Sequence, residues 1–87
     1  MLLLTIFDLD AEKCGPVFTA ENENIAKRLI FSQYEKMPSY VAERMEIRLL
    51  GQLDVNLAQL QFTGDSVSLG TISSVQELFA GGKNEDR

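Results

Sequence analysis

The stretch that decides the fold covers residues 17–37, VFTAENENIAKRLIFSQYEKM, in which a short apolar segment leads into an acidic cap and an amphipathic helix. Asn22 is a residue type that caps helices, and Glu21 and Glu23 place negative charge near the positive end of the helix dipole. Apolar residues then recur at helical spacing, at Ala26, Leu29, Ile30 and Met37. The pattern predicts one long helix with one face on a core.

Strands are expected on both sides of this helix. Residues 2–9, LLLTIFDL, are almost uniformly apolar, which is typical of a strand in the middle of a sheet. A brief strand over residues 17–19 should precede the helix, and residues 45–54 alternate between apolar and polar types. A strand, a helix and a strand form a crossover unit, so a right-handed connection is expected if the first and third strands are neighbours.

The alternation of residues 45–54 resumes at Ala58, which predicts a hairpin. A turn over residues 54–57 would pair Leu53 with Ala58 and, further along, Gly51 with Leu60 and Leu49 with Phe62. Apolar positions then meet apolar positions throughout, so we expect this face of the hairpin to be core.

The C-terminal third contains weaker signals. Gly64 and Asp65 predict a turn before a short edge strand at residues 67–69, and Ser73 and Ser74 form overlapping capping boxes that start a short helix. Gly81 and Gly82 should end that helix, leaving residues 83–87 as a flexible charged tail. The prediction is a single α+β domain over residues 1–82: a mostly antiparallel sheet of about four strands, one long helix on one face and a short C-terminal helix.

Composition narrows the possible chemistry. The 87 residues include no histidine and one cysteine, Cys14, so neither a Cys/His zinc site nor a Ser-His-Asp triad can form within one chain. The net charge of −5 opposes general attraction to nucleic acid. With no export signal and no long apolar segment, we expect no membrane contact, a cytoplasmic location and a reduced, unpaired Cys14.

One local site could still contact a nucleic acid or a partner protein. Lys27, Arg28 and Phe31 share the second face of the helix, and Arg48 could contribute from the hairpin. An aromatic ring beside cations can stack on a single-stranded base while the cations meet phosphates. The alternative is that this flank is covered by residues 40–44 or by another subunit.

An oligomer interface is indicated by two leucines on otherwise polar surface. Leu50 and Leu57 would be apolar residues on the outer face of the hairpin. We expect a homodimer that uses them.

Asp8 and Asp10 follow the first strand on the same side, and with Asp54 or Glu43 they could bind a divalent metal. An early strand that ends in Asp before a helix resembles the small ferredoxin-like subunit of CRISPR adaptation complexes, which makes a metal-dependent nuclease the alternative function. The simpler interpretation is that both residues are solvated and end a strand, with no catalytic residue, metal or cofactor.

Several short motifs, taken together, resemble a family. They are Ile6-Phe7-Asp8, Gly15-Pro16-Val17-Phe18 with Ala20-x-Asn22, Ala26-x-Arg28, and Leu50-Gly51-Gln52-Leu53-Asp54. In order and spacing they are similar to the small nonstructural protein of gokushovirus-type Microviridae, phages with single-stranded DNA genomes, often labelled a DNA-binding or replication-associated protein. The chain departs from that family in its shorter turn after Asp54 and in lacking an acidic His-Pro segment before Met45.

The resemblance implies a phage protein made in the host bacterial cytoplasm. We expect a non-enzymatic accessory protein that serves genome replication or packaging through single-stranded DNA, a phage or host replication protein, or both. A third possibility is an acidic inhibitor that occupies the nucleic-acid site of a host factor.

Overall fold

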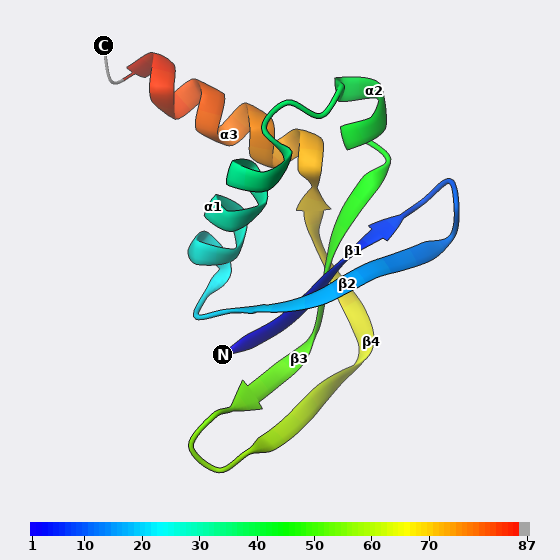
Figure 1. The fold of residues 1–87 in the computed structure, drawn as a ribbon, viewed down its shortest axis with the longest axis vertical. Helices are drawn as coiled ribbons and strands as arrows, with labels where there is room; N and C mark the ends of the chain where they lie inside the picture. Colours follow the sequence, from blue (N-terminus) through cyan, green and yellow to red (C-terminus); the bar gives the residue numbers. More distant parts are fainter. Residues whose placement is uncertain (86–87) are drawn as a thin grey trace.

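The computed structural model describes the backbone of residues 1–85 and the side chains of residues 1–79. A four-stranded antiparallel sheet in the order β2-β1-β3-β4 carries its helices toward one end (Figure 1). The elements along the chain are β1 (Leu2–Asp8), β2 (Lys13–Ala20), α1 (Glu23–Tyr34), α2 (Ser39–Ala42), β3 (Met45–Asp54), β4 (Gln59–Thr71) and α3 (Ile72–Glu85). The predicted α+β class is confirmed.

Strand β1 is central, as its apolar sequence predicts, but the crossover differs from the expected one. The strand predicted over residues 17–19 begins at Lys13 and forms a hairpin with β1, so the chain reverses before it enters α1. Strands β1 and β3 are therefore neighbours but antiparallel. The connection through α1 joins β2 to β3, which run parallel to each other with β1 between them.

Helix α1 begins where its sequence predicts. The Asn22 side-chain carbonyl accepts a hydrogen bond from the backbone N–H of Ile25 at 2.9 Å, which satisfies one of the free donors of the first turn. At the other end, the Gln76 side chain of α3 donates to the carbonyls of Tyr34 at 2.9 Å and Met37 at 3.0 Å. This contact fixes α3 against the end of α1.

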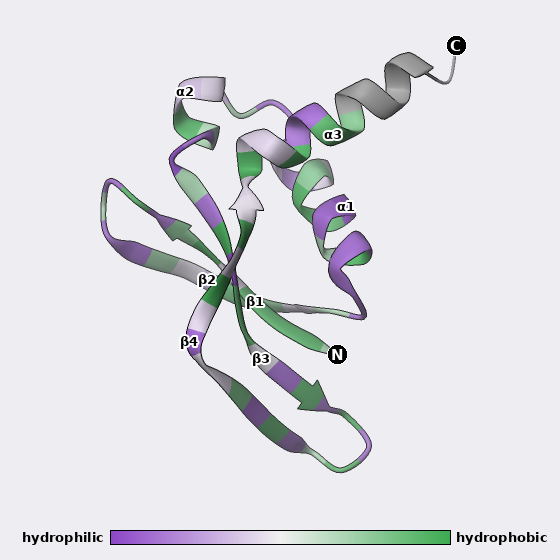
Figure 2. Cartoon of the chain, turned by 180° about the vertical axis from the view of Figure 1, so that it is seen from behind, coloured by the Kyte–Doolittle hydropathy of each residue, from purple (hydrophilic) through white to green (hydrophobic). Residues whose placement is uncertain are grey.

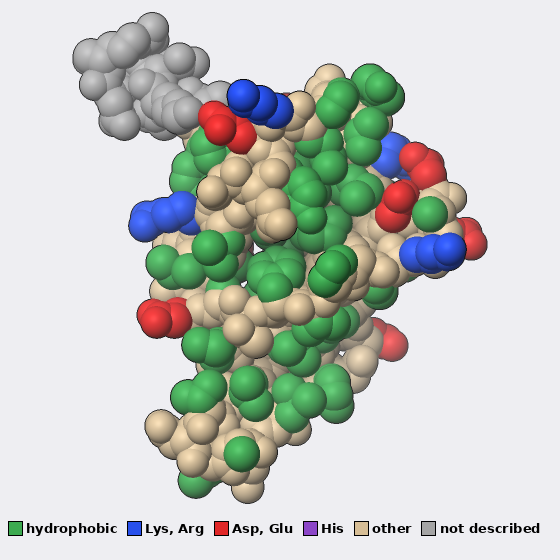
Figure 3. Space-filling model, in the orientation of Figure 1, with side chains coloured by type: hydrophobic (Ala, Val, Ile, Leu, Met, Phe, Trp, Pro, Cys, Tyr) green, Lys and Arg blue, Asp and Glu red, His purple; other side chains and the backbone are tan. Residues whose placement is uncertain are grey.

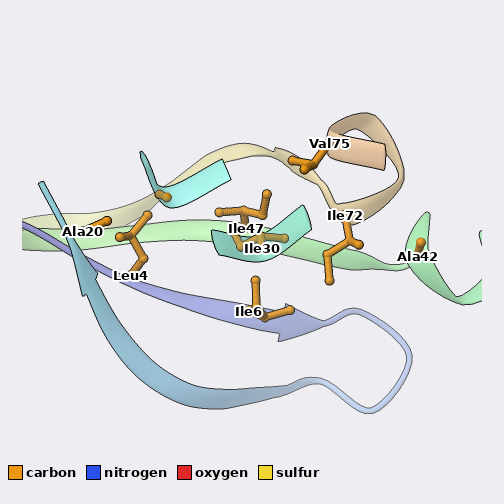
Figure 4. Packing of buried hydrophobic residues seen from close by; sticks show 9 residues of the cluster. Leu4, Ile6, Ala20, Ile30, Ala42, Ile47, Ile72 and Val75 are labelled. Atoms are coloured by element: carbon orange, nitrogen blue, oxygen red, sulfur yellow. The ribbon is translucent and has the colours of Figure 1, made fainter. Parts of the chain in front are cut away.

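The core lies between the sheet and these helices (Figure 4). Leu4 and Ile47 come from the adjacent strands β1 and β3, while Ile30 comes from α1 and Val75 from α3. Each of these four side chains is at most 2% exposed. The third helix is therefore part of the core rather than an appendage.

The β3–β4 hairpin forms, but the predicted register is wrong. Leu53 pairs with Leu60, Gly51 with Phe62 and Leu49 with Val67. The loop is displaced because the Asp54 carboxylate accepts the N–H groups of Asn56 at 3.0 Å and Leu57 at 3.2 Å, and the chain turns through Ala58 at φ 53°. Near the loop the partners of Leu53 and Gly51 are displaced by two residues, so apolar residues still oppose apolar residues. The partner of Leu49 is displaced by five, because the register shifts between Leu49 and Gly51.

The predicted turn at Gly64 and Asp65 is also wrong, because β4 runs continuously from Gln59 to Thr71. The pairing with β3 shifts register between Leu49 and Gly51, and Gly64 adopts φ 89° within the irregular segment. Glycine there allows an irregularity in one long strand rather than a reversal of the chain.

Helix α3 begins one residue before the predicted capping boxes. Thr71 accepts the N–H of Ser74 at 3.1 Å through its hydroxyl oxygen, so Thr71 rather than Ser73 or Ser74 caps the helix. The helix continues past Gly81 and Gly82 to Glu85, so the predicted stop is wrong. The flexibility of residues 83–87 stays a prediction. Glycine lowers helix stability by only about 1 kcal/mol and does not by itself end a helix. Residues 86–87 of the predicted tail lie outside the described residues.

Candidate binding surfaces

The predicted basic site on α1 is only partly presented to solvent. Lys27 forms an ion pair with Glu23 at 2.9 Å, and Arg28 is exposed. Phe31, expected to face outward, is half-buried and stacks on Phe79 of α3, with ring centroids 4.9 Å apart. Neither residues 40–44 nor another subunit is needed to cover this ring, because α3 contacts it.

Arg48 lies on the opposite side of the sheet from α1. Its neighbour Ile47 is buried in the core beneath the helices, and successive strand residues point to opposite faces. The Arg48 guanidinium donates to the Ser66 hydroxyl at 2.9 Å and the Ser66 carbonyl at 3.1 Å, and it forms an ion pair with Glu46. The structure does not bring Arg48 together with Lys27, Arg28 and Phe31.

The two leucines predicted for an oligomer interface are also separate. Leu50 is half-buried beside Phe7 and Cys14 in a hollow on the face that carries Arg48. Leu57 lies in the loop at the end of the hairpin and is 64% exposed. These positions do not bring Leu50 and Leu57 together in one surface patch.

The carboxylates of Asp8 and Asp10, the candidate metal ligands, already bind groups of the same chain. One Asp8 carboxylate oxygen accepts the backbone N–H groups of Asp10 at 2.9 Å and Ala11 at 3.1 Å. The Asp10 carboxylate pairs with Arg44 at 3.1 Å. Among the residues that the structure describes, no group of three or more His, Cys, Asp or Glu side chains could hold a metal ion. Asp8 therefore orders the β1–β2 turn.

A different surface stands out in the structure: the end of the β3–β4 hairpin, residues 51–63, here called the arm. It extends away from the helices, and hydropathy alternates along both of its strands (Figure 2). Large apolar side chains are exposed on it, namely Val55 at 59%, Leu57 at 64%, Leu60 at 46% and Phe62 at 64%. On the face that Figure 3 shows, hydrophobic side chains gather at this end of the molecule.

The arm is separate from the core even though β3 passes through both. Leu49 packs against the buried cluster, whereas Leu53, Leu60 and Phe62 are not among its neighbours. At this point β3 shifts register against both β1 and β4. The arm contains a single charged residue, Asp54, and no lysine or arginine.

Apart from Leu57, sequence reasoning missed the exposed apolar residues of the arm, because the alternation of apolar and polar residues has the same form in a covered and an uncovered strand. The sequence does contain one signal of an uncharged surface. No lysine or arginine occurs between Arg48 and Lys83, so Asp54 is the single charged residue within residues 51–63. An exposed apolar patch of this kind usually marks a surface that contacts another molecule.

Comparisons with known proteins identify no relative: the chain matches no family model, no curated protein and no solved structure. Within residues 1–85, every helix is too short or too polar to cross a membrane.

Proposed function

We propose that this chain is a non-enzymatic accessory protein of a small single-stranded DNA phage. It serves genome replication or packaging in the host bacterial cytoplasm. It acts through contacts between the arm and another protein. The phage setting rests on the resemblance of residues 6–61 to gokushovirus-type nonstructural proteins. The mode of action rests on the exposed apolar side chains of the arm.

Protein contact is favoured over DNA contact by the distribution of charge. Nonspecific DNA binding depends on several cations that meet phosphates together. Here Lys27, Arg44 and Arg48 are each paired with a carboxylate of the same chain, and Arg48 is on the other side of the sheet from Lys27. The arm has no cation to offer a phosphate.

The test uses a phage that encodes the chain with Phe62→Ser, an exposed position in the arm. The matched control is Val17→Ser, which removes an apolar side chain that is 55% exposed on β2. We expect phage DNA in infected cells, measured by quantitative PCR, to fall at least tenfold with Phe62→Ser and to stay unchanged with Val17→Ser. Equal yields from all three phages would overturn the proposal.

A titration of the purified protein with a fluorescent single-stranded oligonucleotide over a salt series checks the choice of partner. We expect weak binding that is unaffected by Lys27→Ala with Arg28→Ala, since Lys27 is paired with Glu23 and Arg48 lies on the other side of the sheet. Tight, salt-dependent binding that this double variant abolishes would mean that the protein acts through contacts of α1 with DNA rather than through the arm.

A further inference from the structure

One side of the arm is an open sheet edge, because β4 is the last strand of the sheet. The direction of its free backbone groups follows from a contact at the other side of β3. The Leu53 N–H donates to the Met1 carbonyl at 2.7 Å, and the Met1 amino group donates to the Leu53 carbonyl at 3.0 Å. Leu53 therefore directs both backbone groups away from β4. Its neighbours Gln52 and Asp54 direct theirs toward β4.

The same alternation continues across the hairpin. Gln52 pairs with Gln61 and Asp54 with Gln59, so the backbone groups of Gln59 and Gln61 bond to β3. The N–H and C=O groups of Leu60 and Phe62 then point outward along the free edge. These two residues also carry the exposed apolar side chains of the strand.

This edge is self-complementary. The segment 59–63 reads Gln-Leu-Gln-Phe-Thr, with polar residues on one face and apolar residues on the other, and Gln61 is at its centre. An antiparallel copy centred on Gln61 places Leu60 opposite Phe62 of the second copy and Gln59 opposite Thr63. Like faces then meet like faces across the whole segment.

We propose that β4 pairs through residues 59–63 with the same segment of a second copy of this chain, with Gln61 on the two-fold axis. Leu60 and Phe62 of opposite copies exchange their outward N–H and C=O groups, which gives about four hydrogen bonds. The two arms then form one continuous sheet whose apolar strips adjoin. The proposal rests on the proposed function, since it names the partner of the same arm.

The two edges of the sheet differ in the way that this pairing requires. Natural edge strands are protected from pairing by lysine, proline or short length. The β2 edge carries Lys13 and also Pro16, which has no N–H to donate. Residues 59–63 carry no charge and no proline, so a second copy meets neither like-charge repulsion nor a missing donor.

Cross-linking tests the register. In a Cys14→Ser background, Gln61→Cys places two thiols directly opposite each other at a pair that is not hydrogen-bonded, where Cα atoms lie about 4.5 Å apart, within reach of a disulfide. We expect mild oxidation to give a covalent dimer. The control is Gln59→Cys, in which the two thiols would be four residues apart along the paired strands, about 14 Å at ~3.4 Å per residue. This variant should give no covalent dimer. No dimer with Gln61→Cys, or equal dimer with both variants, overturns the register.

A charge exchange tests the pairing itself without altering the core, because Gln61 is exposed. Gln61→Lys and Gln61→Glu each place like charges opposite one another, so each variant should be monomeric by light scattering, with a dimer at least tenfold weaker than that of the unaltered chain. A mixture of the two should form a dimer again. An unaltered chain that is monomeric at high micromolar concentration, or a mixture that stays monomeric, overturns the pairing.

Failure of the pairing and failure of the proposed function give different results. If the unaltered chain is monomeric while Phe62→Ser still lowers phage DNA, the arm contacts a different protein, so the pairing is overturned and the proposed function stands. If the chain dimerises through Gln61 but Phe62→Ser leaves phage DNA unchanged, the pairing stands and the proposed function is overturned.

Discussion

At the scale of single residues, Asp8 shows how a candidate ligand can be a structural residue. Its carboxylate accepts two backbone N–H groups in the β1–β2 turn. Asp8→Ala should lower the free energy of unfolding by about 1 kcal/mol, because two donors lose their acceptor. Asp8→Asn keeps an acceptor oxygen and should cost less than half as much, as measured by urea unfolding.

The same two variants separate this role from catalysis. With magnesium or manganese and labelled DNA or RNA, neither the unaltered chain nor Asp8→Asn should cleave the substrate. Cleavage that disappears in Asp8→Asn would establish the nuclease alternative.

Phe31 is the residue whose predicted role changes most. Because its ring stacks on Phe79, Phe31→Ala should lower the free energy of unfolding by about 2 kcal/mol through lost burial and the aromatic pair. Arg28→Ala on the exposed surface should change it by no more than about 0.5 kcal/mol. If Phe31→Ala leaves stability unchanged but weakens binding to single-stranded DNA, the Phe31 ring stacks on a DNA base rather than contributing to the packing of α3.

At the scale of elements, Gly51 allows the close approach of β3 and β4. A Cβ atom built there would overlap the Gln61 carbonyl oxygen, so Gly51→Ala must separate the strands of the arm. We expect the free energy of unfolding to fall by about 2 kcal/mol. Gly64→Ala is the contrasting variant: it meets no atom within 4 Å and should cost only about 1 kcal/mol, from its positive φ. Similar losses in urea unfolding would contradict the close approach.

Elements with a local signal could be predicted from the sequence. Asn22 caps α1 and the alternation over residues 45–54 marks β3, because each depends on residues a few positions apart. The hairpin register could not be predicted, because it depends on how Asp54 and Ala58 shape the loop. The contact between Phe31 and Phe79 joins residues far apart in sequence, and no periodicity within α1 distinguishes a neighbouring helix from solvent.

At the scale of the whole molecule, the main difference between expectation and structure is that the apolar side of the hairpin changes face along β3. Leu49 is paired with the buried Leu4, whereas Gly51 is paired with Leu3, the next residue of β1, whose side chain points to the other face of the sheet. The alternating residues of the hairpin were expected to be core throughout. In the structure, Ile47 and Leu49 meet the core, whereas Leu53, Leu60 and Phe62 follow the register shift and lie on the face away from the helices. An apolar face therefore identifies residues suited to burial without saying whether this chain or another buries them.

This division between core and arm predicts two different responses to substitution. At a protein concentration below dimer formation, Leu60→Thr with Phe62→Thr should change the free energy of unfolding by no more than about 1 kcal/mol, since both side chains are exposed and threonine suits a strand. Ile47→Ala, at a side chain that is 0% exposed, should cost about 3 kcal/mol. Urea unfolding of the two variants measures both values. A loss in the arm variant equal to that of Ile47→Ala would mean that the arm packs on its own chain in solution. The small loss expected instead would leave the apolar side chains of the arm available to another chain.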